Sequence, residues 1–159
     1  MSDLARGVDS VVHRGAMIAW LTVAILGSGL DVTYPLEYTA LAHEIAGSGV
    51  LLSEYPPETS PRTYHFSLRN CLTSGLSRPV VVLEVAEGSG SLITAACALE
   101  QGRDVMAVPG NPLSGRNRSG HALIRDGAKI VKSADDILEE LGMPNGDVSS
   151  SGVDTKAFE

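Results

Sequence analysis

Hydrophobic residues along this chain follow two spacings, one typical of buried strands and one typical of amphipathic helices. The run Val80-Val81-Val82 is continuous, as expected for a strand covered on both faces of a parallel sheet. Residues 4–18 place apolar side chains three and four positions apart, which predicts a helix. The same criteria predict strands at 22–26, 50–53, 79–85, 105–108 and 129–131, and helices at 37–46, 68–76, 92–101, 121–127 and 134–141.

Strands that alternate with helices are typical of an α/β fold with a doubly wound, mostly parallel sheet. We therefore expect one domain over residues 1–141, followed by a polar, disordered tail over 142–159. The chain opens on a predicted helix, whereas a doubly wound sheet begins with a strand. We accordingly expect Met1 to be an internal or late start within a longer reading frame.

The composition of the chain indicates to which classes of protein it can belong. At 159 residues, with 43% apolar and 19% charged residues, the chain suits one folded domain. Its longest apolar stretch, residues 16–26, is too short to span a membrane and makes a poor signal peptide. Cys71 and Cys97 are too few for a disulfide scaffold and lack zinc-site spacing, which predicts two free thiols, one partly exposed and one buried. A cytoplasmic location follows as the default expectation.

Charge is distributed unevenly along the chain. The net charge is −7, yet residues 62–132 carry nine basic and five acidic groups, a net +4. Residues 1–61 and 133–159 carry −5 and −6. This cationic segment suits a polyanion as a partner, although arginines scattered over the surface would give the same count.

Two glycine-rich turns follow predicted strands, at residues 27–31 and 88–92. The second leads into a helix, whose free backbone N–H groups could hold a phosphate with help from Ser89, Ser91 and Thr94. A tight turn without a ligand remains the alternative for both. Upstream of the second turn, a polar and cationic patch at residues 69–78 could bind phosphate through its arginines, or could be an ordinary solvated helix face.

Signals for catalysis are weak. Glu84 and Glu87 follow a buried strand, where a carboxylate could act as a general base or simply accept a hydrogen bond. The four histidines have no metal-ligand spacing, and neither Ser28 nor Ser89 lies in a nucleophile elbow. We expect no catalytic residue, metal or cofactor.

Ordered sequence words resemble the DprA/Smf DNA-processing family over about residues 4–141. The words are Leu4-Ala5-Arg6-Gly7-Val8-Asp9, His13-Arg14-Gly15, Gly29-Leu30-Asp31-Val32, Tyr34-Pro35, Leu52-Ser53-Glu54-Tyr55-Pro56, Phe66, Arg69-Asn70, Ser74-Gly75-Leu76-Ser77, Gly90-Ser91-Leu92-Ile93-Thr94-Ala95, Ala98-Leu99-Glu100-Gln101-Gly102-Arg103, Ala107-Val108-Pro109-Gly110 and Leu123-Ile124-Arg125-Asp126-Gly127-Ala128.

The resemblance implies a Rossmann-like domain that binds single-stranded DNA without catalysing a reaction. It implies protection of incoming strands in natural transformation, assistance in loading the RecA recombinase, and action as a homodimer. The implied DNA-binding residues, with the adjacent Arg78, are Arg69, Asn70, Ser74, Gly75, Ser77, Arg78, Gly90, Ser91 and Thr94. Self-association is expected around Leu123 and Ile124.

Departures from the family pattern also carry information. The family's first strand, with its Gly-Ser-Arg turn, is not found, so the chain looks like a member truncated at its N-terminus. Ser2-Asp3 stands where the family has Ser-Gly, and Cys71 stands where it has a second arginine. Two alternatives to DNA binding stay open: a nucleoside-monophosphate phosphoribohydrolase on a similar fold, and a non-functional fragment. The enzyme would need a Pro-Gly-Gly-x-Gly-Thr word, which residues 85–94 do not supply.

Overall fold

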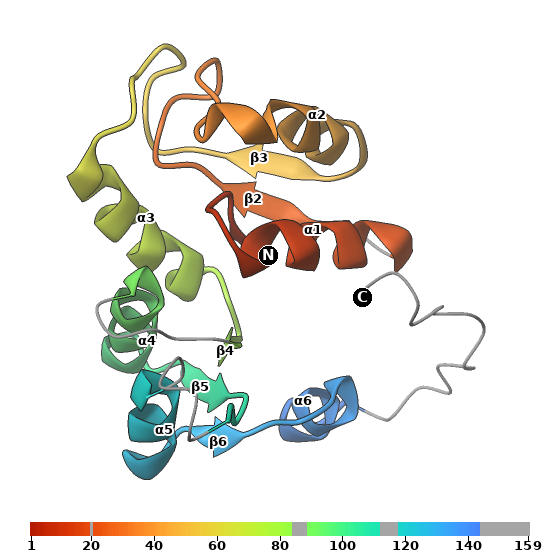
Figure 1. Cartoon of the computed structure of the whole chain (residues 1–159), viewed down its shortest axis with the longest axis vertical. Coiled ribbons are helices and arrows are strands. Elements are labelled where there is room, and N and C mark those ends of the chain that lie inside the picture. The colour runs from red at the N-terminus through yellow and green to blue at the C-terminus, as the bar shows by residue number, and fades with distance from the viewer. Residues whose placement is uncertain (20, 84–88, 112–117, 144–159) are drawn as a thin grey trace.

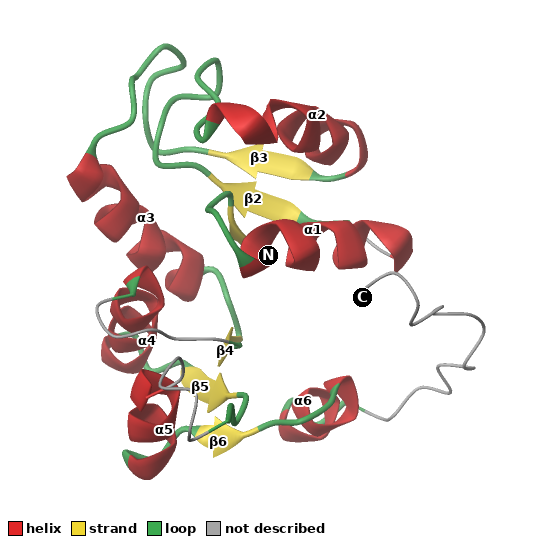
Figure 2. Ribbon diagram, viewed as in Figure 1, coloured by secondary structure: helices red, strands yellow, loops and turns green. Residues whose placement is uncertain are grey.

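The computed structural model describes residues 1–19, 21–83, 89–111 and 118–143. Within these ranges strands alternate with helices and form two three-stranded parallel sheets. The two sheets lie apart in Figure 1 and Figure 2. This confirms the prediction of an α/β, doubly wound, parallel architecture. The predicted tail lies outside the described residues from position 144 onward.

The first sheet has the strand order β1-β2-β3, with β1 (Ser2–Asp3), β2 (Val23–Ile25) and β3 (Val50–Leu52). Helix α1 (Val8–Ala19) connects β1 to β2. The 3-10 turn η1 (Leu36–Tyr38) and helix α2 (Thr39–Ser48) connect β2 to β3. The core of this half is built from bulky aliphatic side chains and small alanines: Leu4, Ala24, Leu26, Leu41, Ala42 and Ile45.

The second sheet has the order β4-β5-β6, with β4 (Pro79–Val82), β5 (Asp104–Ala107) and β6 (Lys129–Ile130). Helices α4 (Gly90–Glu100), α5 (Arg118–Arg125) and α6 (Ala134–Glu140) belong to this half. Its core consists of valines from the strands and alanines from α4, which let the helix lie close to the sheet: Val80, Val82, Ala95, Ala98, Val105 and Ala107.

Helix α3 (Thr63–Gly75) crosses from the first sheet to the second (Figure 1). It contacts β1 and β2 on one side and packs along α4 on the other. A disulfide between Cys71 of α3 and Cys97 of α4 joins the two helices. The prediction of two free thiols was therefore wrong, because the packing of α3 on α4 brings together cysteines that are 26 positions apart.

Most predicted elements are confirmed within a few residues, and two differences matter. The expectation that no strand precedes the first helix was wrong, because Ser2 and Asp3 pair with Ala24 and Ile25 of β2. Two residues are too few to show any hydrophobic period. Helix α3 begins at Thr63, five residues earlier than predicted, since the polar residues of its first turns hid the helical spacing.

Candidate nucleic-acid interface

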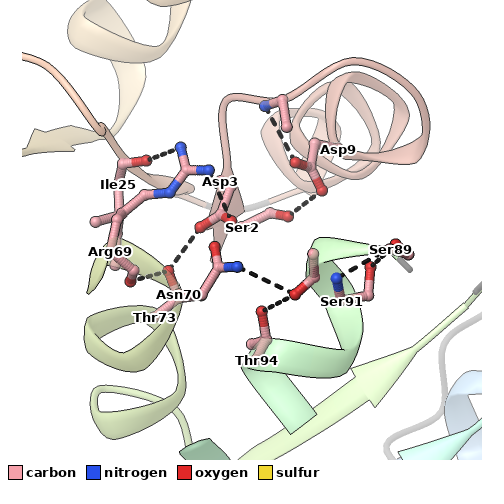
Figure 3. A network of polar contacts seen from close by, with 12 residues as sticks. Ser2, Asp3, Asp9, Ile25, Arg69, Asn70, Thr73, Ser89, Ser91 and Thr94 are labelled. Atoms are coloured by element: carbon pink, nitrogen blue, oxygen red, sulfur yellow. Dashed lines mark hydrogen bonds and ion pairs between the residues drawn. The ribbon is translucent and has the colours of Figure 1, made fainter. Parts of the chain in front are cut away.

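A cavity of about 1110 Å³ is lined by both β1 and β4. Residues from α3 and from the start of α4 also line it, so segments far apart in the sequence meet there. Six of the nine residues predicted to bind DNA belong to this lining: Arg69, Asn70, Ser77, Gly90, Ser91 and Thr94. Figure 3 shows the polar contacts that connect these segments.

Arg69 is buried and its charge is compensated inside the protein. Its Nη2 lies 3.0 Å from Oδ2 of Asp3, and its Nη1 donates to the carbonyl of Ile25 at 3.1 Å. The guanidinium also lies over the ring of Phe66, 5.4 Å from the centroid. Only 6% of the Arg69 side chain is exposed, so the residue expected to reach a phosphate instead holds β1 and β2 against α3.

The pKa values of this ion pair show how strongly burial acts on it. Burial raises the pKa of Asp3, although Arg69 and the hydroxyl of Thr73 both favour its carboxylate form. Burial likewise lowers the pKa of Arg69, against the attraction of Asp3. Each partner is therefore stabilised in its charged form mainly by the other, and removing either would leave an uncompensated charge.

A second group of predicted residues gathers at the start of α4, which follows the carboxyl end of β4 along the chain. The amide of Asn70 donates to the carbonyl of Gly90 at 3.1 Å, and the hydroxyl of Thr94 lies 3.4 Å from the same oxygen. The side chain of Ser89 caps the helix by accepting from the N–H of Ser91. Ligands of doubly wound sheets bind at such carboxyl ends, where helix N–H groups attract anions.

The remaining predicted residues lie elsewhere, near the amino end of β4. Ser74 is fully buried and donates to the side chain of Gln101 at 2.6 Å, and the carbonyl of Gly75 accepts from Arg103 at 2.7 Å. Both residues thus help α3 pack against the end of α4. Arg78 is exposed directly before β4. The nine residues therefore do not form one continuous surface.

The first glycine-rich turn is packed against other parts of the chain. A Cβ on Gly29 would come within 2.1 Å of the carbonyl oxygens of Pro56 and Pro57, and one on Gly27 would come within 2.6 Å of the ring of Phe66. The hydroxyl of Ser28 donates to the carbonyl of Val32. The alternative of a tight turn without a ligand explains this segment.

Other predicted residues lie mostly inside the fold. Leu123 and Ile124 are half-buried and pack against the second core. Glu84 and Glu87 lie outside the described residues. Among the described residues there is no group of three metal-ligating side chains, and no helix is long and apolar enough to cross a membrane.

Two residues of the network were missed as functional candidates. Asp3 accepts from Arg69 and from the hydroxyl of Thr73 at 2.6 Å, so it links β1 to α3 twice. The sequence carries one signal for Asp3, because an aspartate stands there in place of the family's glycine. Its partner could not be inferred, because Thr73 lies 70 positions away.

Parallel strands joined by crossover helices define an α/β protein of the doubly wound class, in which polar groups gather at the start of α4. The profile of the family described as DNA recombination-mediator protein A matches residues 1–142. The chain belongs to this family.

Curated relatives and solved structures support the same family assignment. The chain is 44% identical over 142 residues to DNA processing protein DprA of Streptococcus pneumoniae, covering 89% of this chain and 50% of that protein. It is 46% identical over 142 residues to DprA of Bacillus subtilis, covering 89% of this chain and 48% of the relative. It matches the X-ray structure of S. pneumoniae DprA with a TM-score of 0.83 at 44% identity, over 87% of this chain and 50% of that one.

A structure of DNA processing protein A from Helicobacter pylori, which concerns its single-stranded DNA binding mode, matches with a TM-score of 0.78 at 26% identity. That match covers 88% of this chain and 64% of the other. The chain spans about half the length of the curated relatives from S. pneumoniae and B. subtilis.

Proposed function

We propose that this chain binds single-stranded DNA, without catalysing a reaction, at the carboxyl end of β4. One observation carries the proposal: residues of two separate family motifs, on α3 and α4, line the same cavity beside the N-terminus of α4. The Helicobacter pylori relative, whose structure concerns single-stranded DNA binding, supports the choice of ligand.

The chemistry of this surface fits a phosphate. Hydroxyls of Ser89, Ser91 and Thr94 can donate hydrogen bonds to an anion, and the positive end of the α4 dipole attracts it, while the N–H groups of Ser91 and Leu92 already donate to Ser89. Because Asp3 compensates Arg69, long-range attraction of the strand has to come from exposed arginines of residues 62–132. Arg62, Arg78, Arg103 and Arg125 are exposed there.

The biological role that the family suggests is protection of incoming single strands and help in loading RecA. We also propose a homodimer in the cytoplasm. Cytosolic thiols keep most disulfides reduced, so the Cys71–Cys97 bond would be exposed to reduction in that compartment.

The test is the fluorescence anisotropy of a labelled single strand of about 30 nucleotides, titrated with the chain at several salt concentrations. Ser91→Glu places a carboxylate in the first turn of α4. A negative charge there favours the helix but repels phosphate. We expect roughly tenfold or greater loss of affinity from this variant, with no loss of thermal stability.

Ala40→Glu is the matched control, because it adds the same charge to the exposed first turn of α2, and Ala40 is not among the residues that line the cavity. Its affinity for the single strand should equal that of the unmodified chain. Arg78→Gln should lower the slope of log affinity against log salt by about 0.7 if Arg78 contacts one phosphate. Equal affinity of the Ser91→Glu and Ala40→Glu variants, or preference for duplex DNA of the same sequence, would refute the proposed site.

A further inference from the structure

A second groove, of about 450 Å³, lies along α3 on a face that the candidate DNA site does not use. Most of its lining comes from α3 and the residue that follows it: Glu54, Leu68, Cys71, Leu72, Gly75, Leu76 and Gln101. None of these described residues lines the larger cavity. Small-molecule pockets have volumes of roughly 300–1,000 Å³, so the groove has the size to take a small ligand.

Apolar side chains dominate the wall that α3 gives to this groove. Leu68, Leu72 and Leu76 are spaced four positions apart and therefore follow one face of the helix. Leu68 and Leu76 are 55% and 54% exposed, so much of this apolar surface is in contact with water. A small molecule with a short carbon chain would cover it favourably.

The groove gives access to one end of the disulfide between α3 and α4. Cys71 lines the groove and is half-buried, whereas Cys97 is 8% exposed and is not among the lining residues. In thiol–disulfide exchange a thiolate attacks one of the two sulfurs, and access decides which one. An incoming thiol in the groove therefore meets Sγ of Cys71 first.

Polar contacts beside the disulfide hold α3 against α4 independently of it. Ser74 donates to Oε1 of Gln101 at 2.6 Å, and Nε2 of Gln101 donates to the carbonyl of Cys71 at 2.9 Å. Arg103, just after α4, donates to the carbonyl of Gly75 at 2.7 Å. None of these three bonds involves a sulfur atom. Opening the disulfide therefore leaves the contacts that shape the groove in place.

We propose that Cys71 is a modification site, which takes up a low-molecular-weight thiol from the groove by exchange with the disulfide, with Cys97 as the resolving thiol. The thiolate of the small molecule attacks Sγ of Cys71. A new S–S bond forms as the bond to Cys97 breaks, and Cys97 leaves as a thiolate that takes a proton from water. The reverse attack of the Cys97 thiolate on Sγ of Cys71 expels the small thiol and restores the original disulfide.

This exchange replaces one disulfide by another, so it consumes no oxidant and no reductant beyond the small thiol itself. The family pattern has an arginine at the position of Cys71, so the site is a property of this chain. The inference goes beyond DNA binding and does not depend on it, because the groove and the larger cavity share no described lining residue.

The variants Cys97→Ser and Cys71→Ser are a matched pair that tests which sulfur the groove presents. Each lacks the disulfide and keeps one thiol, and circular dichroism checks that both are folded. With glutathione disulfide as the probe, Cys71 of the first variant should form a mixed disulfide at least about tenfold faster than Cys97 of the second. Intact-mass spectrometry measures both rates. Equal rates in the folded variants, or faster reaction of Cys97, would overturn the proposal.

The unmodified chain tests the role of Cys97. After reduction and removal of the reductant, glutathione disulfide should modify Cys71 and then lose the bound glutathione as the disulfide to Cys97 forms again. At the end of the reaction we expect at least about tenfold less bound glutathione than on the Cys97→Ser variant. Equal amounts of bound glutathione on the two proteins would show that Cys97 does not resolve the adduct.

The route of entry is tested by filling the groove. Leu68→Trp, made in the Cys97→Ser variant, places a larger side chain beside Cys71. Leu99→Trp in the same variant is the matched control, because Leu99 is 62% exposed on α4 and does not line the groove. The first change should slow the modification of Cys71 about threefold or more, and the second should leave it unchanged. Equal rates for the two would contradict entry through the groove.

Discussion

The two strands that line the cavity, β1 in the first half of the molecule and β4 in the second, are held in place by different kinds of contact. In the first half, β1 is only two residues long and is fixed by polar side chains. His13 of α1 contacts the carbonyl of Asp3 at 2.9 Å, and the Asp3 carboxylate accepts from Arg69 and Thr73. In the second half, β4 is held by apolar packing of Val80 and Val82 and by its ladder with β5.

This difference shows how α3 organises the molecule. Its Arg69 and Thr73 reach the first half through Asp3, while Asn70 and Cys71 reach α4 in the second half. Helix α3 thus contacts both halves: Arg69 and Thr73 contact β1, and Asn70 and Cys71 contact the segment that begins with α4. The same helix supplies the family motif that lines the cavity, so the candidate site is assembled only when both halves are in place.

The largest effect should come from breaking the polar anchor of β1. Asp3→Ala leaves the buried Arg69 guanidinium without its carboxylate, and removal of one member of a buried pair costs about 3–5 kcal/mol. Urea unfolding monitored by circular dichroism measures this loss. The double variant Asp3→Ala/Arg69→Met should recover part of the lost stability, because it no longer buries an unpaired charge.

A surface ion pair provides the matched control. Arg6 and Glu37 are 2.7 Å apart but more than half of each side chain is exposed. Glu37→Gln should leave the unfolding midpoint nearly unchanged, since solvent screens such pairs. If Glu37→Gln and Asp3→Ala lowered stability equally, the contrast between a buried anchor and a surface pair would be refuted.

The next largest loss of stability should come from removing the disulfide between α3 and α4. The disulfide closes a loop between positions 26 apart, and loop-closure entropy gives it about 3.5 kcal/mol of stabilisation. Cys71→Ser with Cys97→Ser, or the reduced wild-type chain, should lose about this amount in denaturant unfolding. The first half should be affected less: hydrogen exchange should rise in α3 and α4 and stay unchanged in α2. Equal exchange in the oxidised and reduced chains would show that packing alone holds α3 on α4.

The same contrast between halves explains what could be predicted from sequence. The strand β4 and helices α4 and α2 have strong local hydrophobic patterns, and they form where the pattern placed them. The strand β1 and the ion pair between Asp3 and Arg69 depend on contacts across 66 positions, for which a single sequence gives no signal. For the candidate site, the motif residues were identifiable, but their burial was not. Arg69 and Ser74 look like surface residues in a polar stretch and prove to be interior.

The smallest effect should be a dependence of stability on pH through His13, which is fully buried in the first half. Its Nε2 lies 2.9 Å from the carbonyl of Asp3 and so donates, and its Nδ1 can then accept from the hydroxyl of Thr22 at 2.8 Å. The neutral ring can make both bonds, and burial lowers the pKa of His13 below its ordinary value of 6.5, although the Asp3 carbonyl and, more weakly, Asp9 oppose the shift.

Because the unfolded chain then binds a proton more readily than the folded one, stability should be full above pH 6.5 and fall as the pH drops below it. One proton limits the slope to about 1.4 kcal/mol per pH unit. His13→Asn should be less stable at pH 7.5 and lose this dependence between pH 6.5 and 5, measured by urea unfolding at each pH. The second half offers a comparison, because His121 is only half-buried, so His121→Asn should keep the pH dependence of the unmodified chain. If His121→Asn abolished the dependence of stability on pH instead, the histidine responsible would lie in the second half. The contacts of His13 with Asp3 and Thr22 would then not explain the pH dependence.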